Sequence, residues 1–296
     1  MSRFGTVAVL GAPNAGKSTL VNAIVGQKVA IVSPKAQTTR ARLMGIAIAG
    51  DTQMLLVDTP GIFLPARRLD RAMVKAAWEG ADFADRIVLV IDSAASIGSK
   101  VEQVIAGVAG RPEPRILVLN KVDIANKAKL LALAQSLSER LTPEAIYFVS
   151  ATTEDGVADL KAHLAAAMPE SPWHYPEDQL TDATDRMVAA ELTREQLYLQ
   201  LRNELPYASA VETEKWEDRP DGSAAIHQQI LIERDSQKAI IVGKGGSRLK
   251  AIGSAAREAI AEHLGRRVHL YLHVKVAPRW GEDRGLYEEI GLDWAD

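Results

Sequence analysis

The sequence of 296 residues contains no cysteine and no long apolar run. The lack of cysteine excludes disulfide bonds, thiolate metal sites and thiol catalysis, and it suits a reducing compartment. No apolar run reaches the roughly 18 residues that a membrane-spanning helix needs. The first four residues, Met1–Phe4, do not resemble the start of a signal peptide. We therefore expect a soluble, cytoplasmic protein without a transmembrane segment.

Neither sign of charge dominates, because 35 basic residues face 38 acidic ones. This balance gives no global indication of a polyanionic partner, so a nucleic-acid site would require local segregation of charge. Apolar residues make up 47% of the chain, which is enough for two cores at this length. We expect a first domain over residues 1–172, a linker over 173–183, a second domain over 184–278 and a tail over 279–296.

The first part of the chain alternates short β-branched runs with longer helical patterns. Most runs are apolar on both faces, as in strands of a covered parallel sheet. Runs 43–49 and 54–57 are separated by only four residues, too few for a crossover helix, so they predict an antiparallel hairpin. Further strands are predicted at 7–10, 87–91, 116–119 and 146–149, and helices at 18–25, 69–79, 101–109, 127–141 and 157–168. The pattern predicts an α/β fold with a mostly parallel sheet.

Three prolines, Pro169, Pro172 and Pro176, then interrupt any regular element and indicate the linker. The order of elements changes after them. The sequence predicts a long helix at 184–204, strands at 207–216 and 224–232 with a turn at 219–222, helices on both sides of 243–246, and a last strand at 268–276. This order predicts a smaller α+β domain.

A complete phosphate loop, G-x-x-x-x-G-K-[ST], follows the first predicted strand. Its glycines allow backbone N–H groups to point at phosphate oxygens, and the helix that begins there faces the anion with its N-terminus. Lys17 can reach the β- and γ-phosphates, and the Ser18 hydroxyl can ligate Mg²⁺. The expected nucleotide-binding residues are Gly11, Ala12, Pro13, Asn14, Ala15, Gly16, Lys17, Ser18 and Thr19.

Three further motifs each follow a predicted strand, at the carboxyl edge where open α/β sheets bind ligands. We expect Asp58 to hold the metal and the Gly61 N–H to bond the γ-phosphate, which makes the site a switch. Asp123 can accept two hydrogen bonds from guanine, whereas adenine would leave it unpaired, so GTP is favoured over ATP. The motifs are Asp58, Thr59, Pro60, Gly61 and Ile62; Asn120, Lys121, Val122 and Asp123; and Ser150 and Ala151.

Ile62 occupies the position at which Ras-like enzymes carry a glutamine that orients the attacking water. An isoleucine side chain cannot hydrogen-bond water. Hydrolysis must therefore depend on phosphate positioning, Mg²⁺, backbone donors and a further group supplied from elsewhere, and we expect slow intrinsic GTP hydrolysis.

These motifs and the segment 33–40, SPKAQTTR, resemble the Era family of bacterial GTPases. In that family the segment is the first switch, and its threonine ligates Mg²⁺ when the γ-phosphate is present. The resemblance gives this role to Thr39, with Thr38 as the alternative. It implies Mg²⁺ ligands Ser18, Thr39 and Asp58, and catalytic residues Lys17, Thr39 and Gly61. Asn14 matches the asparagine that potassium-dependent relatives use as a K⁺ ligand. An equally good interpretation is that Asn14 is only a residue of the local turn.

A second glycine motif, G-x-x-G at 243–246, lies between apolar residues and a basic helix start. The order of elements around it resembles a type II KH domain, which clamps four nucleotides of single-stranded nucleic acid. Residues 237–284 carry ten basic and four acidic side chains, as phosphate binding requires, although a solvated basic face would look the same. The expected RNA-binding residues are Ile240, Val242, Gly243, Lys244, Gly245, Gly246, Arg248 and Lys250.

The Era resemblance extends from the phosphate loop to the tail. It implies a GTP-driven switch that binds 16S rRNA near its 3′ end and assists maturation of the 30S ribosomal subunit. It also implies a monomer that is cytoplasmic and associates weakly with the inner face of the cell membrane. Two alternatives remain: a GTPase whose second domain binds protein or membrane, and an RNA-binding protein whose nucleotide site is only structural.

Overall fold

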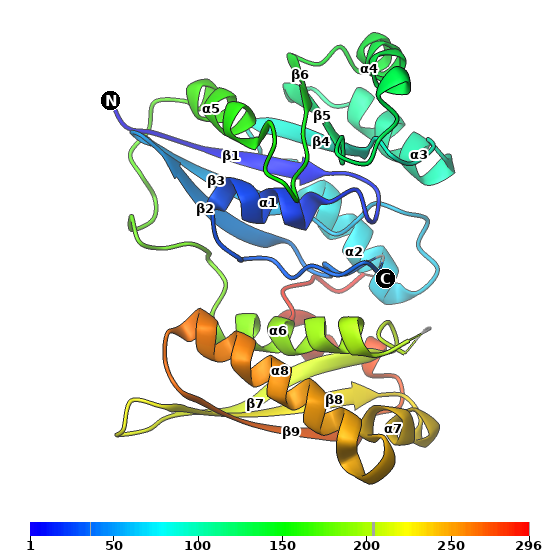
Figure 1. Cartoon of the computed structure of the whole chain (residues 1–296), viewed down its shortest axis with the longest axis vertical. Coiled ribbons are helices and arrows are strands. Elements are labelled where there is room, and N and C mark those ends of the chain that lie inside the picture. The colour runs from blue at the N-terminus through cyan, green and yellow to red at the C-terminus, as the bar shows by residue number, and fades with distance from the viewer. Residues whose placement is uncertain (36, 203–204, 296) are drawn as a thin grey trace. The chain divides into compact units, whose positions relative to one another are not determined.

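The computed structural model in Figure 1 describes residues 1–35, 37–202 and 205–295. Two compact units form along the chain. The first comprises residues 1–32 and 39–182 together with Ala295, and the second comprises residues 33–38 and 183–294. The short segment 33–38 therefore packs with the second unit, although both of its flanking segments belong to the first.

The first unit is built on a six-stranded sheet in the order β2-β3-β1-β4-β5-β6. All neighbouring strands run parallel except β2 and β3, which form the expected antiparallel hairpin. The strands are β1 (Arg3–Leu10), β2 (Leu43–Ala49), β3 (Thr52–Asp58), β4 (Arg86–Asp92), β5 (Arg115–Asn120) and β6 (Ala145–Phe148). The α/β fold predicted from the apolar runs is confirmed.

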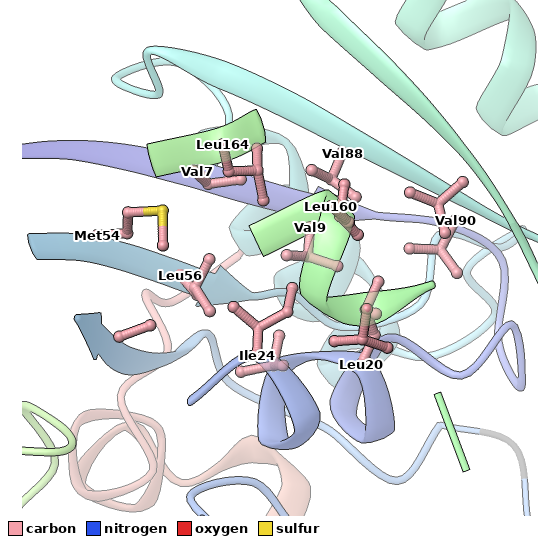
Figure 2. Close-up of a cluster of buried hydrophobic side chains, with 14 of the residues drawn as sticks. Val7, Val9, Leu20, Ile24, Met54, Leu56, Val88, Val90, Leu160 and Leu164 are labelled. Atoms are coloured by element: carbon pink, nitrogen blue, oxygen red, sulfur yellow. The ribbon is translucent and has the colours of Figure 1, made fainter. Parts of the chain in front are cut away.

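Helices cover both faces of this sheet because its inner strands are apolar on both sides. In β1, Val7 and Val9 face a cluster that contains α1 and α5, as Figure 2 shows, whereas Ala8 and Leu10 face α2, α3 and α4. The helices are α1 (Lys17–Val25), α2 (Arg68–Glu79), α3 (Ser99–Ala109), α4 (Lys127–Leu141) and α5 (Val157–Ala167). The five helical patterns seen in the sequence are thus all present, with ends shifted by no more than two residues.

Residues 169–182 run along the first unit and are hydrogen-bonded to it at several points. The buried side chain of Gln53 accepts from the amides of His174 and Tyr175 at 3.1 and 3.0 Å and donates to the carbonyl of Tyr175 at 2.9 Å. Further along, the Thr181 hydroxyl donates to the carbonyl of Met44 at 2.7 Å, beside a bridge from Thr181 to Gly45. This segment, called the strap below, is fixed to the sheet up to the start of the second unit.

The second unit contains a three-stranded sheet in the order β7-β8-β9, with β7 antiparallel and β9 parallel to β8. Its core joins residues of the sheet and of three helices. The elements follow in the order α6 (Asp185–Gln200), β7 (Ser209–Asp218), β8 (Ala224–Ile232), α7 (Asp235–Val242), α8 (Ser247–Leu264), β9 (Val268–Val276) and α9 (Arg284–Glu289). The predicted order helix, strand, strand, helix, G-x-x-G, helix, strand is confirmed.

Helix α6 is shorter than the sequence predicted. It ends at Gln200 because Leu201 takes an extended conformation, with φ −96° and ψ 159°. The predicted end at Glu204 lies outside the described residues. The adjoining strand β7 begins at Ser209 rather than at residue 207, since the hydroxyl of Ser209 donates to the carbonyl of Pro206 in the preceding turn.

The C-terminal tail packs within the second unit. Trp280 is buried and its indole N–H donates to the carbonyl of Ala208 at 3.2 Å. Tyr287 is also buried, donates to the carbonyl of Gly281 at 2.7 Å and contacts the ring of Trp294, with centroids 5.0 Å apart. Among the described residues, no helix combines the length and apolarity needed to cross a membrane.

Candidate functional site

The phosphate loop turns from β1 into α1 through left-handed backbone conformations at Asn14 and Gly16, with φ of 64° and 93°. A side chain at Gly16 would be strained, and its Cβ would lie 2.2 Å from the amide nitrogen of Asn120. Gly16 is also the N-cap of α1, so the free backbone N–H groups of the first helical turn face the loop. The loop therefore has the conformation that a phosphate-binding turn requires.

Lys17 is buried beneath this loop. Its ammonium group donates to the carbonyls of Gly11 and Ala12, at 3.2 and 3.1 Å. Burial lowers the pKa of Lys17 to about 8, and the nearby charge of Asp58 opposes this shift. Burial thus disfavours the charged form of Lys17, and a bound phosphate would stabilise that form.

Three oxygen-bearing side chains converge next to Lys17. Ser18 donates to Oδ2 of Asp58 at 2.6 Å, Thr39 donates to the same atom at 3.2 Å, and the two hydroxyls lie 2.9 Å apart. Oδ1 of Asp58 is buried without a hydrogen-bond partner among the described residues, and burial raises the pKa of this carboxyl although Lys17 and the hydroxyls lower it. The unpaired carboxylate oxygen of Asp58 and the two hydroxyls together form a set of hard oxygen donors that suits Mg²⁺.

Of the two adjacent threonines, only Thr39 reaches this cluster. The hydroxyl of Thr38 bonds instead to the hydroxyl of Ser33 at 2.8 Å and to the carbonyl of Lys35 at 2.9 Å. The two side chains therefore belong to different hydrogen-bond networks, a distinction that the sequence left open.

The segment that follows Asp58 is held against the phosphate loop. The hydroxyl of Thr59 donates to the carbonyl of Val9 at 2.7 Å, and the amide of Ile62 donates to the carbonyl of Gly11 at 3.2 Å. A Cβ at Gly61 would lie 2.8 Å from Pro13, so only glycine permits this approach. The side chain of Ile62 is buried in the core cluster with α2, α3 and α4, and it offers no polar atom to a substrate water.

The side chains of the motif Asn120–Asp123, which the sequence predicts to select the base, connect it to the phosphate loop. Asn120 donates to the carbonyl of Ala15 at 2.9 Å and accepts from the amide of Ala151 at 3.0 Å. Lys121 donates to the carbonyl of Asn14 at 2.8 Å and pairs with Asp92 at 2.6 Å. Asp123 is exposed. The phosphate loop and all three strand-end motifs therefore meet at one edge of the sheet, and Asp92 is a member that sequence reasoning missed.

In the second unit, the G-x-x-G turn ends at the N-terminus of α8, with positive φ at Gly243, Gly245 and Gly246. A groove of about 420 Å³ begins there and runs between α8 and β9. It is lined by Gly246, Leu249, Lys250, Gly253, Ser254, Arg257, Leu270 and Leu272. Its apolar wall and its cations are the combination that a single-stranded nucleic acid requires, because bases need apolar contact and phosphates need positive charge.

Of the eight residues that the sequence predicted to bind RNA, the groove is lined by Gly246 and Lys250. Lys244, Gly245 and Arg248 are exposed, and Ile240 is 50% exposed, whereas Val242 packs against the hydrophobic core. Sequence reasoning missed Gly253, Arg257 and the two leucines of β9. The i, i+3 and i+7 spacing of Lys250, Gly253 and Arg257 places them on one face of α8 and could have indicated this wall.

The fold and these two sites define a phosphate-loop GTPase joined to a KH domain. Residues 6–121 match the family described as 50S ribosome-binding GTPase, and residues 204–281 match the KH domain family. The chain belongs to the family of GTPase Era and has its GTP-hydrolysing domain. It is 61% identical to GTPase Era of Erythrobacter litoralis over 99% of this chain and 98% of that protein, and 54% identical to GTPase Era of Rhizobium meliloti over 99% and 94%.

Two solved structures are similar over almost the whole chain. One is Era in complex with MgGDPNP and nucleotides 1506–1542 of 16S ribosomal RNA, and the other is a point variant of Aquifex aeolicus Era bound to GDP·AlF4⁻. Each is 34% identical, covers 98% of this chain and 99% of its own, and has a TM-score of 0.92. The α/β GTPase unit and the KH unit predicted from the sequence are thereby confirmed.

Proposed function

We propose that this chain binds Mg²⁺-GTP at the carboxyl edge of its six-stranded sheet and binds the 3′ end of 16S rRNA in the groove between α8 and β9, and so assists 30S subunit maturation. The observation that carries the proposal is the similarity, with a TM-score of 0.92, to the solved structure of Era in complex with MgGDPNP and nucleotides 1506–1542 of 16S ribosomal RNA. The groove beside G-x-x-G and the oxygen cluster of Ser18, Thr39 and Asp58 support it independently.

In the proposed reaction, the charge of Lys17 and the amides of the phosphate loop hold the β- and γ-phosphates. Ser18, Thr39 and Asp58 would hold the magnesium ion, which neutralises charge on the phosphate oxygens when it is bound. Asn120 keeps the loops in register, and Asp123 selects guanine. Gly61 donates its N–H to the γ-phosphate. Since Ile62 cannot orient water, we infer that intrinsic turnover is slow.

Binding of a 3′-terminal 16S rRNA fragment to the full chain tests the RNA part of the proposal. Lys244→Asp combined with Gly245→Asp should weaken binding at least tenfold, because acidic groups would face phosphates at the N-terminus of α8. Gly245 has φ 60°, a conformation that aspartate tolerates, and no atom lies within 4 Å of its added Cβ. Fluorescence anisotropy at several salt concentrations measures the affinity and the number of phosphates contacted.

Lys100→Asp, at the exposed first turn of α3, is the control for the change in charge. It should leave RNA affinity unchanged, and GDP affinity should be equal in all variants. Wild-type-like RNA affinity in the double variant would refute the groove assignment. RNA affinities that are the same with GDP and with a non-hydrolysable GTP analogue would favour a merely structural nucleotide site.

We further propose that Asn14 provides a K⁺ ligand during hydrolysis. Its side chain is exposed at the loop, its backbone has φ 64°, and its carbonyl accepts a hydrogen bond from Lys121. An added cation there would act where transition-state charge develops. Equal GTPase rates in K⁺ and Na⁺ would remove this proposal.

The domain bounds proposed are 1–172 for the GTPase domain, 173–183 for the linker, 184–278 for the KH domain and 279–296 for the tail. We also propose a cytoplasmic monomer that associates weakly with the inner face of the cell membrane, as the Era resemblance implies. Light scattering after size-exclusion chromatography tests the monomer, and sedimentation with anionic vesicles tests the membrane association.

A further inference from the structure

Two residues in left-handed conformations are joined at the carboxyl edge of the six-stranded sheet. Asn14 of the phosphate loop has φ 64°, and Lys121, which follows β5, has φ 65°. This conformation is uncommon for a residue other than glycine, and it persists only where neighbouring groups hold it in place. The ammonium group of Lys121 donates to the carbonyl of Asn14 at 2.8 Å, so the two loops are connected at this point.

Asp92, the last residue of β4, also binds this ammonium group. Its Oδ2 lies 2.6 Å from Nζ of Lys121, and its Oδ1 accepts from the amide of Ala94 at 2.9 Å. Because both carboxylate oxygens are engaged, the side chain of Asp92 is held in one orientation. The side chains of Asp92 and Lys121 are only 22% and 30% exposed, which reduces screening of the ion pair by water. A charged acceptor also makes this hydrogen bond stronger than one between neutral groups.

The backbone beside the ion pair is fixed as well. The neighbouring strands β4 and β5 in Figure 1 place Asp92 opposite Asn120. The amide and the hydroxyl of Ser93 both donate to the carbonyl of Asn120, at 2.9 and 2.6 Å. Asp92 and Lys121 therefore extend from two strand ends that are bonded to each other. The sheet positions the carboxylate of Asp92, and this carboxylate in turn positions Lys121.

The hydrogen bond from Lys121 to Asn14 joins the loop proposed to hold the phosphates to the motif proposed to hold the base. We propose that Asp92 is a positioning residue, which holds Lys121 on the carbonyl of Asn14 and thereby slows the release of guanine nucleotides. Without this carboxylate, the ammonium group can turn to water, and the phosphate loop loses a hydrogen bond at a left-handed residue. Such a loss changes dissociation more than association. This inference rests on the proposed function, because it takes the nucleotide to bind both loops.

Asp92→Asn tests the inference, because asparagine keeps the size of the side chain and an oxygen for the amide of Ala94 but offers no charge to Lys121. Dissociation of a fluorescent GDP analogue, followed by stopped flow after addition of excess GDP, should become about tenfold faster, as expected for loss of a charge-assisted hydrogen bond. The association rate should change by no more than about twofold. A non-hydrolysable GTP analogue should dissociate faster by the same factor, since the proposed γ-phosphate donor Gly61 follows a different strand, β3. Asp92→Glu, which keeps a carboxylate, should retain most of the slow release.

Asp85→Asn is the matched control, because Asp85 precedes the opposite end of β4 and accepts from the amide of Thr6. It should release both nucleotides at the wild-type rate. If Asp92 acts through Lys121, then Asp92→Asn combined with Lys121→Met should release GDP as fast as Lys121→Met alone, whereas independent effects would multiply the rates. Multiplied rates, a wild-type rate in Asp92→Asn, or a change confined to the GTP analogue would overturn the inference. A wild-type chain that binds ADP as tightly as GDP would instead refute the proposed function.

Discussion

The side-chain amide of Asn120 donates a hydrogen bond to the backbone carbonyl of Ala15, at 2.9 Å, and so joins the end of β5 to the phosphate loop. Through its Oδ1, Asn120 also accepts from the amide of Ala151 at 3.0 Å. Since Asn120 is 2% exposed, these bonds are sheltered from water. The phosphate loop and the loops that follow β5 and β6 are thus held together by hydrogen bonds within the protein.

Asn120→Ala should therefore weaken both binding and folding. Removal of the amide leaves the carbonyl of Ala15 and the amide of Ala151 unpaired, which should lower the free energy of unfolding by about 2 kcal/mol. Affinities for GTP and GDP should fall by at least tenfold together. Chemical denaturation and fluorescent nucleotide titration measure the two effects. Asn126→Ala is the control, because it removes only the N-cap bond to Ala128 at the start of α4. Normal nucleotide affinity in Asn120→Ala would show that the loops do not need this connection.

Asp123→Asn should change which base is bound. An amide can donate to the 2-oxo group of xanthine, whereas it would oppose the amino group of guanine, so preference should move from GTP to xanthosine triphosphate. Competition between the two nucleotides for the same site gives the ratio of affinities. A variant that keeps its full preference for GTP would contradict the role given to Asp123.

The pKa of Lys17, lowered by burial to about 8, predicts a pH dependence of nucleotide binding. Phosphate binding needs the charged ammonium, so affinity for GDP should fall as pH rises through 8, by up to tenfold for each further unit. Lys17→Arg keeps its charge in this range and should bind with a flat profile. An affinity in the wild-type chain that is constant from pH 7 to 9.5 would be inconsistent with a Lys17 that loses its proton near pH 8.

The lowered pKa of Lys17 also makes the stability of the folded chain depend on pH. In the ligand-free chain the folded state loses the proton near pH 8, while the unfolded state retains it up to about pH 10.4. The contribution of Lys17 is therefore unfavourable below pH 8 and diminishes as pH rises through this window. The free energy of unfolding of the wild type minus that of Lys17→Arg should therefore rise between pH 7 and pH 10, because only the wild type loses the penalty of a buried charge in this range.

Gly253 should decide how large a base fits in the proposed RNA groove between α8 and β9. It lies within helix α8, where glycine costs about 1 kcal/mol relative to alanine, and a Cβ added there would touch only Leu272, at 3.9 Å. Gly253→Ala should therefore raise stability slightly and retain RNA binding. Gly253→Leu should fill the groove and weaken RNA binding more than tenfold, with unchanged GDP affinity. Equal RNA affinity in the alanine and leucine variants would show that the RNA bases do not bind in this groove.

The sequence predicted the elements of the sheet well, because apolar runs such as those in β4 and β5 carry the signal for burial on both faces locally. The ends of strands were less predictable where residues far away in the sequence determine them. Strand β1 begins at Arg3 because Arg3 pairs with Thr52 and bridges to Glu170, and neither partner is visible from the polar residues at the start of the chain. Local composition cannot report such pairing.

The candidate sites divide in the same way. The phosphate loop and the G-x-x-G turn have local sequence signatures, since each is a tight turn that needs glycine at fixed positions. The wall of the proposed RNA groove has no local signature, because Leu270 and Leu272 resemble other strand residues until β9 packs beside α8. The hydrogen bond from Lys35 to the carbonyl of Leu201 joins residues 166 positions apart, so only the folded chain reveals it.

The strap from residue 169 to 182 covers buried polar groups of the GTPase unit. The side chain of Gln53 accepts from the amides of His174 and Tyr175, and the Thr181 hydroxyl donates to the carbonyl of Met44. A GTPase fragment cut at residue 168 would leave these groups without their partners, so it should unfold more easily than a fragment that ends at residue 182.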